Sequence, residues 1–159
     1  MTDQIREVEK KIFSTFSDVA SSIGYSPLHG HIIGVLLVKG KPLSLQDLAK
    51  ETGYSSSMIS LSLDLLQILG VVKKIKRAAD RKLYVELTGD LLEALKHAVL
   101  TKLSKSIATS IRDFEEGRKA LQPLQGPERD RVLKTIQTLE TQIKRLKTYV
   151  DLLSKAGLP

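Results

Sequence analysis

The densest run of charge in the sequence is basic and lies between Val71 and Lys82. Its twelve residues include six cations and a single anion, Asp80, so the segment carries +5 of the chain's net charge of +7. The six cations are Lys73, Lys74, Lys76, Arg77, Arg81 and Lys82. Like charges at this density repel one another unless solvent or a polyanion screens them. Taken alone, the cluster is as consistent with a solvated basic hairpin as with a surface that binds nucleic acid.

No other group of residues has the pattern of a catalytic or metal-binding centre. The chain has no Cys, which excludes a disulfide framework, a thiolate zinc site and a cysteine nucleophile. His29 and His31 lie two residues apart on a predicted helix and therefore face different directions, and His97 is alone on another. The sequence contains no phosphate-binding glycine loop, nucleophile elbow or HExxH motif. We expect neither an enzyme nor a bound metal or cofactor.

The composition is that of a globular protein with a real core. The chain has 159 residues, of which 42% are hydrophobic and 27% charged, so we expect one domain of ordinary size or a small domain with an appendage. Its longest apolar stretch, Ile32 to Val38, is far shorter than the roughly 20 residues of a membrane span. The first 24 residues are charged throughout and lack the apolar region of a secretory signal. We expect a cytoplasmic protein without membrane partners.

Two helices are predicted at the start of the chain. Apolar residues from Ile5 to Ile23 recur every three or four positions, which gives one stripe of an amphipathic helix. Ser26 and Pro27 then have the residue types of an N-cap and a first helical position. The helix that follows, over 28–39, is apolar nearly all round, so it should be the buried one.

A pair of shorter helices is predicted next. Ser44 is placed to cap the first of them, with Asp47 in its first turn, and Gly53 follows its end. Ser55 caps a second helix that runs to Gly70. Two capped helices three residues apart predict a helix-turn-helix, although a helical hairpin in any small protein gives the same pattern.

The basic cluster falls on two predicted strands. Residues 71–77 and 82–87 are β-branched and aromatic enough to form a hairpin, joined through residues 78–81. A helix-turn-helix followed directly by a basic two-stranded wing is harder to explain as a plain helical hairpin.

At this point the sequence resembles the winged helix-turn-helix regulators of the MarR superfamily, in particular their GbsR-like branch. The resemblance covers essentially the whole chain. The matching segments are Leu48-Ala49-(x3)-Gly53-(x)-Ser55-(x3)-Ile59-Ser60, Leu69-Gly70-Val71-Val72, Asp80-Arg81-Lys82-(x)-Tyr84 and Leu87-Thr88. It implies a mainly α fold with a small β-wing: a winged helix-turn-helix DNA-binding domain over 1–88 and a C-terminal helical dimerisation region over 89–159. It also implies a homodimeric transcriptional regulator, acting as a repressor, that reads a pseudo-palindromic site.

The resemblance assigns DNA contacts to the recognition helix, 55–69, and to the basic wing, 71–87. Ser55 would offer a phosphate its hydroxyl and the positive end of the helix dipole. Leu61 could contact a thymine methyl group, and Arg81 resembles the wing arginine that enters the minor groove, oriented by Asp80. The candidate DNA-binding residues are Ser55, Ser56, Ser57, Ser60, Leu61, Lys73, Lys74, Lys76, Arg77, Arg81 and Lys82.

One feature of the recognition helix departs from the usual pattern. Its exposed face is expected to lack Arg, Lys, Asn and Gln, the side chains that make bidentate contacts to bases. Direct readout of sequence should therefore be weak, and specificity would come from groove shape and the wing. Two alternatives stay open: a low-specificity architectural DNA-binding protein, and a winged helix that serves as a protein-interaction module.

The two long helices predicted at the C-terminus have different apolar patterns. Thr88 is expected to cap the first, with Leu87 packed on Leu92, and the helix continues to about Leu121. Its apolar residues step by four throughout, so its stripe drifts around the axis. No effector is assigned to this region, because a cage for a quaternary ammonium needs several converging aromatic rings and the chain has four Tyr, three Phe and no Trp.

The last helix carries a heptad pattern. Its apolar residues step alternately by four and three, which predicts a seam for another helix. The seam residues are Val132, Ile136, Leu139, Ile143, Leu146, Val150 and Leu153. The two helices could merely pack on each other within one chain, but so small a pair would leave apolar surface exposed. We therefore expect a homodimer that presents two wings to successive half-sites of double-stranded DNA.

Overall fold

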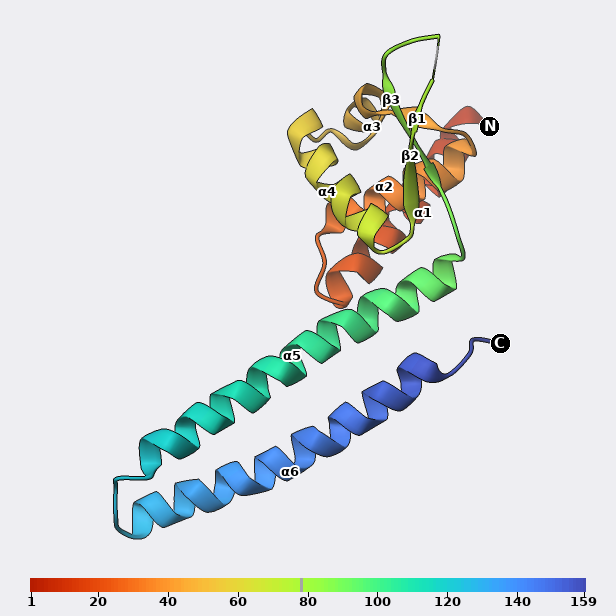
Figure 1. Ribbon diagram of the computed structural model, residues 1–159. Helices are drawn as coiled ribbons and strands as arrows, with labels where there is room; N and C mark the ends of the chain where they lie inside the picture. Colours follow the sequence, from red (N-terminus) through yellow and green to blue (C-terminus); the bar gives the residue numbers. More distant parts are fainter. Residues whose placement is uncertain (78) are drawn as a thin grey trace. The chain divides into compact units, whose positions relative to one another are not determined.

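The computed structural model describes residues 1–77 and 79–159 and is mainly helical with a small antiparallel sheet, which confirms the predicted fold class (Figure 1). Within these residues the elements are α1 (Thr2–Ser22), α2 (Pro27–Lys39), β1 (Leu43–Ser44), α3 (Leu45–Thr52), α4 (Ser56–Ile68), β2 (Val72–Lys76), β3 (Leu83–Leu87), α5 (Leu91–Leu121) and α6 (Pro127–Lys155). The predicted strand connection includes Ala78, which lies outside the described residues.

The chain forms two compact units, Met1–Leu95 and Lys96–Pro159. The division falls inside α5, whereas the domain boundary expected from the sequence follows residue 88 and stays a prediction. None of the helices in the described ranges has the length and hydrophobicity that a membrane crossing requires.

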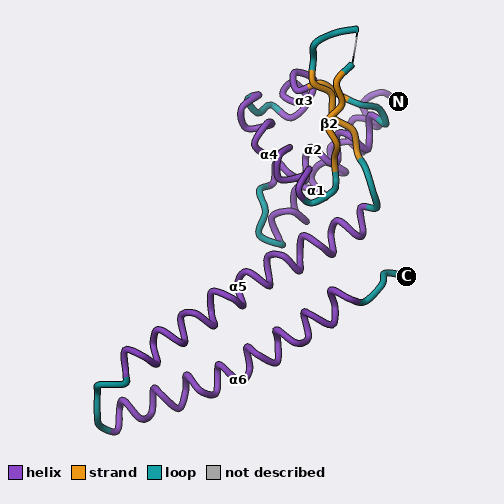
Figure 2. The backbone as a smooth tube through the Cα atoms, in the orientation of Figure 1, coloured by secondary structure: helices purple, strands orange, loops and turns teal. Residues whose placement is uncertain are grey.

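The first unit contains a helix-turn-helix followed by a wing. Strands β2 and β3 pair antiparallel, and β1 adds to the other edge of β3, so the strand order is β1-β3-β2 (Figure 2). Strand β1 is only two residues long and was not predicted, because it contains the same Leu43 and Ser44 that the sequence assigns to a helix start. Both roles hold, since Leu43 pairs with Val85 while the Ser44 side chain accepts a hydrogen bond from the Asp47 N–H.

A single apolar core lies beneath these elements. Helix α2, predicted as the buried one, contributes Ile32 and Val35, which have no exposed surface. Helix α2 also contributes Leu28 and Leu36, α5 contributes Ala94, and the helix-turn-helix and the sheet region contribute the others. The core residues are Leu28, Ile32, Val35, Leu36, Leu43, Leu48, Ile59, Leu63, Leu66, Val71, Val72, Val85 and Ala94.

The predicted helix starts at Ser26, Ser44 and Ser55 are confirmed as N-caps. At Ser44 the capping is reciprocal, because the Asp47 carboxylate accepts from the Ser44 N–H. Hydrogen bonds to the Ser44 side chain and to its N–H, in that order of effect, lower the pKa of Asp47. The turn between α3 and α4 is made by Gly53, whose φ of 76° lies in the left-handed region that a residue with a side chain adopts only at a cost.

The predicted start of α5 is wrong. Helix α5 begins at Leu91, and the Asp90 carboxylate rather than Thr88 accepts from the first turn, 2.8 Å from the Leu92 N–H. Thr88 instead continues the sheet, with its N–H bonded to the Val71 carbonyl at 2.8 Å. Leu92 is 47% exposed and does not serve as the apolar partner expected of it; Leu91 packs against the core in its place.

In the second unit α6 runs antiparallel to the part of α5 that starts at Lys96. Arg118 and Glu140 form an ion pair across the two helices, with 3.1 Å between Nη2 and Oε2. The side chain of Arg129 bonds to the Leu121 carbonyl beside the turn, and that of Lys96 bonds to the Ala156 carbonyl at the other end. The two helices therefore form an antiparallel hairpin that these side-chain contacts join near its turn and at its other end.

Helices α1 and α2 cross with their backbones in direct contact at Gly30. A Cβ atom at this position would lie 1.9 Å from the Phe16 carbonyl oxygen, a distance that only movement of the backbone could relieve. The close approach lets Phe13 reach the core from α1.

We expect Gly30→Ala to lower the free energy of unfolding by about 2–3 kcal/mol, as at other overpacked sites. A loss of stability would indicate the close crossing, because Gly→Ala inside a helix normally stabilises a protein by roughly 0.5–1 kcal/mol. Urea denaturation followed by circular dichroism measures the change. Gly117→Ala is the control, since its Cβ would meet only Ile136 Cδ1, at 3.3 Å, and should stay within about 1 kcal/mol of wild type. Unchanged stability of Gly30→Ala would contradict the close crossing.

Candidate nucleic-acid interface

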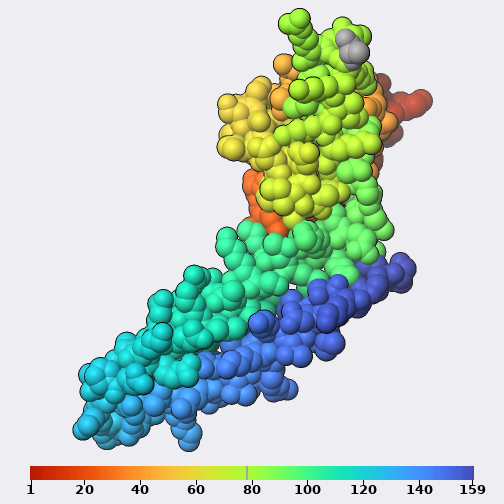
Figure 3. All heavy atoms as spheres, viewed as in Figure 1, coloured from red at the N-terminus to blue at the C-terminus, as the bar shows by residue number. Residues whose placement is uncertain are grey.

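Helix α4 has one buried and one exposed face. Ile59, Leu63 and Leu66 point into the core, and this fixes which residues face outward. The serines and the leucine predicted to contact DNA are on the exposed side; these are Ser56, Ser57, Ser60 and Leu61. The surface of α4 lies next to that of the wing strands (Figure 3).

The N-terminus of α4 is organised by Ser55. Its Oγ accepts a hydrogen bond from the Met58 N–H at 3.3 Å. The hydroxyl proton is not used in this bond, so it stays able to donate to an incoming anion. Together with the first-turn N–H groups and the positive end of the helix dipole, it forms a site where a phosphate oxygen could bind.

The exposed face of α4 was predicted to lack Arg, Lys, Asn and Gln, but it carries one amide side chain, Gln67. Gln67 is exposed and lies two turns after Ser60, on the same side of the helix. The prediction that this face lacks Gln is therefore wrong at Gln67. Gln67 lies in the last turn of α4, whereas helix-turn-helix proteins contact base edges with residues near the start of the recognition helix.

Two of the six wing cations are neutralised within the chain. Lys73 pairs with Glu86, its cross-strand neighbour, at 3.0 Å. Lys74 reaches from β2 to Asp64 on the exposed face of α4, at 2.6 Å. Both ion pairs are partly exposed, and such pairs contribute little to stability, but each removes a positive charge from the basic cluster.

The other four cations lie where β2 ends and β3 begins, which is the distal, turn end of the hairpin. In the described part of the chain none of them forms an ion pair. They are Lys76, Arg77, Arg81 and Lys82. The free positive charge of the wing is therefore concentrated toward its tip rather than spread along the hairpin.

Tyr84 organises the distal part of the wing. The guanidinium carbon of Arg77 lies 4.2 Å from the centre of its ring, a cation–π contact. Its hydroxyl donates to the Asp80 carboxylate at 2.9 Å, and this hydrogen bond is the main reason that the pKa of Tyr84 is raised. Asp80 also accepts from the Lys82 N–H, at 3.3 Å. Asp80 thus holds Tyr84 and the turn. A role for Asp80 in orienting Arg81 stays a prediction.

Backbone hydrogen bonds join the base of the wing to the end of α4. The Val71 N–H donates to the Leu66 carbonyl at 2.9 Å, and the Val71 carbonyl accepts from the Thr88 N–H. Val71 and Val72 are both buried in the core. The recognition helix and the wing are therefore anchored at one point of the first unit.

The predicted dimerisation seam divides into two sets in the second unit. Val150 is buried, and Ile136 and Ile143 are half-buried, within the α5–α6 hairpin. The other four residues of the seam are 36–43% exposed. They recur every seven residues along α6 and are Val132, Leu139, Leu146 and Leu153.

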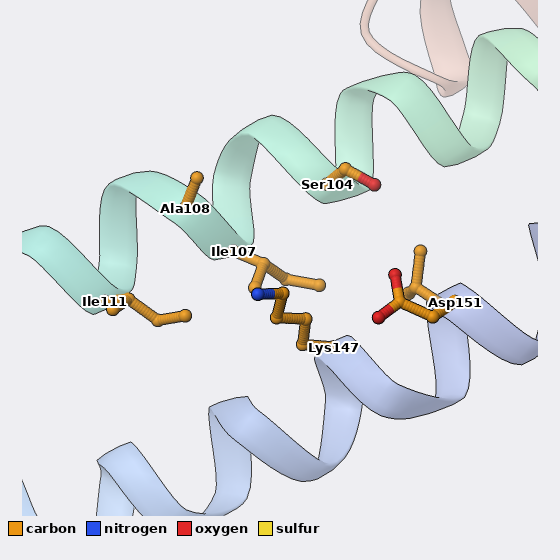
Figure 4. A pocket seen from close by; sticks show the side chains of 7 residues that line it. Ser104, Ile107, Ala108, Ile111, Lys147 and Asp151 are labelled. Atoms are coloured by element: carbon orange, nitrogen blue, oxygen red, sulfur yellow. The ribbon is translucent and has the colours of Figure 1, made fainter.

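A shallow groove of about 310 Å³ lies on the α5–α6 hairpin. Ile107, Ile111 and Val150 supply its apolar lining. Lys147 and Asp151 project into it from α6 (Figure 4). Within the described residues, no cluster of His, Asp and Glu has the composition of a metal site.

Two of the three histidines, His29 and His31, make structural contacts near α2. His29 Nδ1 accepts from the Ser26 N–H at the start of α2. The His31 ring lies 5.2 Å from that of Phe13, and its partial burial lowers its pKa. Both are structural parts of the α1–α2 region.

The comparisons with known proteins show the fold. No family model and no curated protein matches the sequence. A solved structure described as a transcriptional regulator is 22% identical, with a TM-score of 0.61 over 92% of this chain and 96% of that one. AbsC, a MarR-family regulator from Streptomyces coelicolor, is 18% identical over 92% of this chain and 93% of that one, with a TM-score of 0.43.

A third similar structure is a mutant of MepR from S. aureus bound to an oligodeoxyribonucleotide. It is 18% identical over 91% of this chain and 96% of that one, with a TM-score of 0.44. Solved structures similar to this chain thus include MarR-family regulators.

We expect Ser55→Ala to lower the free energy of unfolding by about 1 kcal/mol, the usual value of an N-cap. Ser56→Ala is the matched control, because the Ser56 hydroxyl makes no hydrogen bond in the described structure, and its stability should stay within about 0.5 kcal/mol of wild type. Urea denaturation of the three proteins decides. Equal losses in both variants would show that Ser55 does not have a special role at the start of α4.

Proposed function

We propose that the protein is a homodimeric, winged-helix regulator of transcription that binds double-stranded DNA. The observation that carries this proposal is the group of four cations without ion-pair partners at the distal part of the wing, in the same unit as the exposed face of α4. A basic patch beside a helix-turn-helix is the arrangement by which proteins of this fold bind a duplex.

Helix α4 and the wing would contact different parts of the duplex. The N-terminus of α4 and the wing cations would bind phosphates and so set position and orientation. Ser57, Ser60 and Leu61 would face base edges in the major groove. Arg81, free of ion pairs, is the candidate for the minor groove next to it.

The homodimer is proposed from the exposed half of the α6 seam. Leu139 and Leu146 leave apolar surface uncovered on an α5–α6 hairpin whose other seam residues are already packed. A heptad stripe of this kind fits a second helix of the same type. With two-fold symmetry, two copies would present two recognition helices to a pseudo-palindromic site.

Several finer assignments belong to the same proposal. The GbsR-like branch, the action as a repressor and the cytoplasmic location rest on the sequence pattern alone. The low-specificity architectural protein is the second candidate, and the scarcity of bidentate readers on α4 favours it. A protein-interaction module is the third, and the free cations of the wing disfavour it.

Fluorescence anisotropy with a fragment from upstream of its own gene and a scrambled duplex, over a series of salt concentrations, separates these candidates. Tight binding of the upstream fragment alone supports the regulator. Equal binding of both duplexes supports the architectural protein. Absence of binding at low salt overturns DNA binding altogether.

We expect Arg81→Ala to weaken DNA binding about tenfold at low salt and to reduce the slope of log K against log salt by about 0.9 per wing. Lys134→Ala in α6, an element of the second unit, makes the same change in net charge outside the helix-turn-helix and the wing and should have little effect. Ser57→Ala should change the preferred sequence more than the overall affinity. Wild-type affinity of both the Arg81 and Ser57 variants would contradict these roles.

We expect Leu146→Glu to convert a dimer to a monomer, because it places a charge in the middle of the exposed seam. Thr148→Glu, at an exposed position on another side of α6, should leave the dimer intact. Sedimentation equilibrium of the three proteins measures the mass. A wild-type monomer at micromolar concentration, or a dimer that Leu146→Glu does not affect, would refute the proposed seam.

A further inference from the structure

The centre of the exposed face of α4 is apolar. Leu61 is 72% exposed and lies one turn after Ser57, in the first half of the helix. Met58, three residues earlier on α4, is 47% exposed. Single exposed apolar residues are ordinary on protein surfaces, but this one occupies the place from which a recognition helix contacts base edges.

The charged side chain on this face, Asp64, is already engaged in an ion pair. Asp64, one turn after Leu61, would be able to accept a hydrogen bond from a cytosine amino group, but its carboxylate is held by Lys74 at 2.6 Å. The remaining polar groups near the helix start are hydroxyls, which donate and accept with little discrimination between bases. The most selective contact that this part of α4 can make is therefore apolar.

The surroundings restrict the partner of this apolar surface to a polyanion. The wing cations without ion pairs and the capped N-terminus of α4 both attract phosphates. In the major groove of DNA one base carries an exposed methyl group, on C5 of thymine. RNA lacks this methyl, and the major groove of an A-form helix is too deep and narrow for an α-helix to read.

We propose that α4 selects thymine-containing sites by contact of Leu61 with thymine 5-methyl groups. This inference rests on the proposed DNA-binding function and adds to it the chemical group that is read. It also accounts for specificity on a helix with few bidentate readers, since an apolar contact needs no hydrogen-bonding side chain.

The test compares two duplexes that differ only in methyl groups. The first is composed of A·T pairs, and in the second deoxyuridine replaces every thymidine. Phosphate charge and hydrogen-bonding edges are the same in both. We expect the wild-type protein to bind the thymine duplex about fourfold more tightly for each methyl group contacted, which corresponds to about 0.8 kcal/mol.

Variants assign the effect to Leu61. Leu61→Ala should bind both duplexes with nearly the same affinity. Ile68→Ala is the matched control, because Ile68 is 76% exposed but is the last residue of α4, and it should keep the wild-type preference. Circular dichroism spectra like that of wild type would show that both variants are folded.

The same contact can be tested by adding methyl groups to a duplex, which should increase its affinity for the protein. A G·C duplex should be bound more tightly when 5-methylcytosine replaces cytosine, since this places a methyl group at the corresponding position of the groove. Leu61→Ala should not respond to the replacement.

The outcomes separate this inference from the proposed function. Equal binding of the thymine and uracil duplexes by the wild-type protein, with Arg81→Ala weaker on both, would overturn the reading of thymine and leave DNA binding in place. A preference for thymine that Leu61→Ala retains would overturn the role of Leu61. Absence of binding to every duplex at low salt would overturn both proposals.

Discussion

The buried side of α4 is the constraint on which the candidate interface depends. Ile59, Leu63 and Leu66 are withdrawn from solvent among core residues of α2, α3 and the wing strands, so α4 cannot rotate about its axis without exposing them. Each such residue represents roughly 1.5–3 kcal/mol of burial, and the rotation is therefore strongly opposed. This packing alone determines which residues of α4 face outward, and the outward residues need no contacts of their own to hold that orientation.

Much of this arrangement could be predicted from local sequence patterns. The serine caps, the glycine turn and the β-branched and aromatic residues of the wing strands are local signals within a few residues of one another. The caps, the turn and the hairpin that they predict all appear in the structure. Strand β1 could not be predicted, because two residues give no periodicity and its partner Val85 lies far along the chain. The start of α5 was misplaced for a similar reason: Thr88 and Asp90 are both good caps, and only the sheet pairing of Thr88 decides between them.

The number of cations in the wing sequence does not predict how much of their charge stays unpaired in the folded protein. Six cations in the sequence suggest a uniformly basic hairpin, whereas Glu86 and Asp64 neutralise the two that lie nearest its base. The first partner is fixed by strand register and the second by the orientation of α4, and neither is apparent from a list of charged residues. The cation–π contact of Arg77 with Tyr84 depends in the same way on the folded hairpin. The distribution of free charge at this site is therefore a property of tertiary structure.

The backbone bonds that join Val71 to the end of α4 and to Thr88 have a consequence for how a duplex would be accommodated. They make the separation between the recognition helix and the root of the wing a fixed dimension of the folded chain, established before any partner arrives. The entropic cost of ordering these elements is then part of folding and does not reduce the affinity for a duplex. A duplex whose grooves do not match this dimension would have to deform to fit it, so the stiffness of the nucleic acid itself becomes part of the selection.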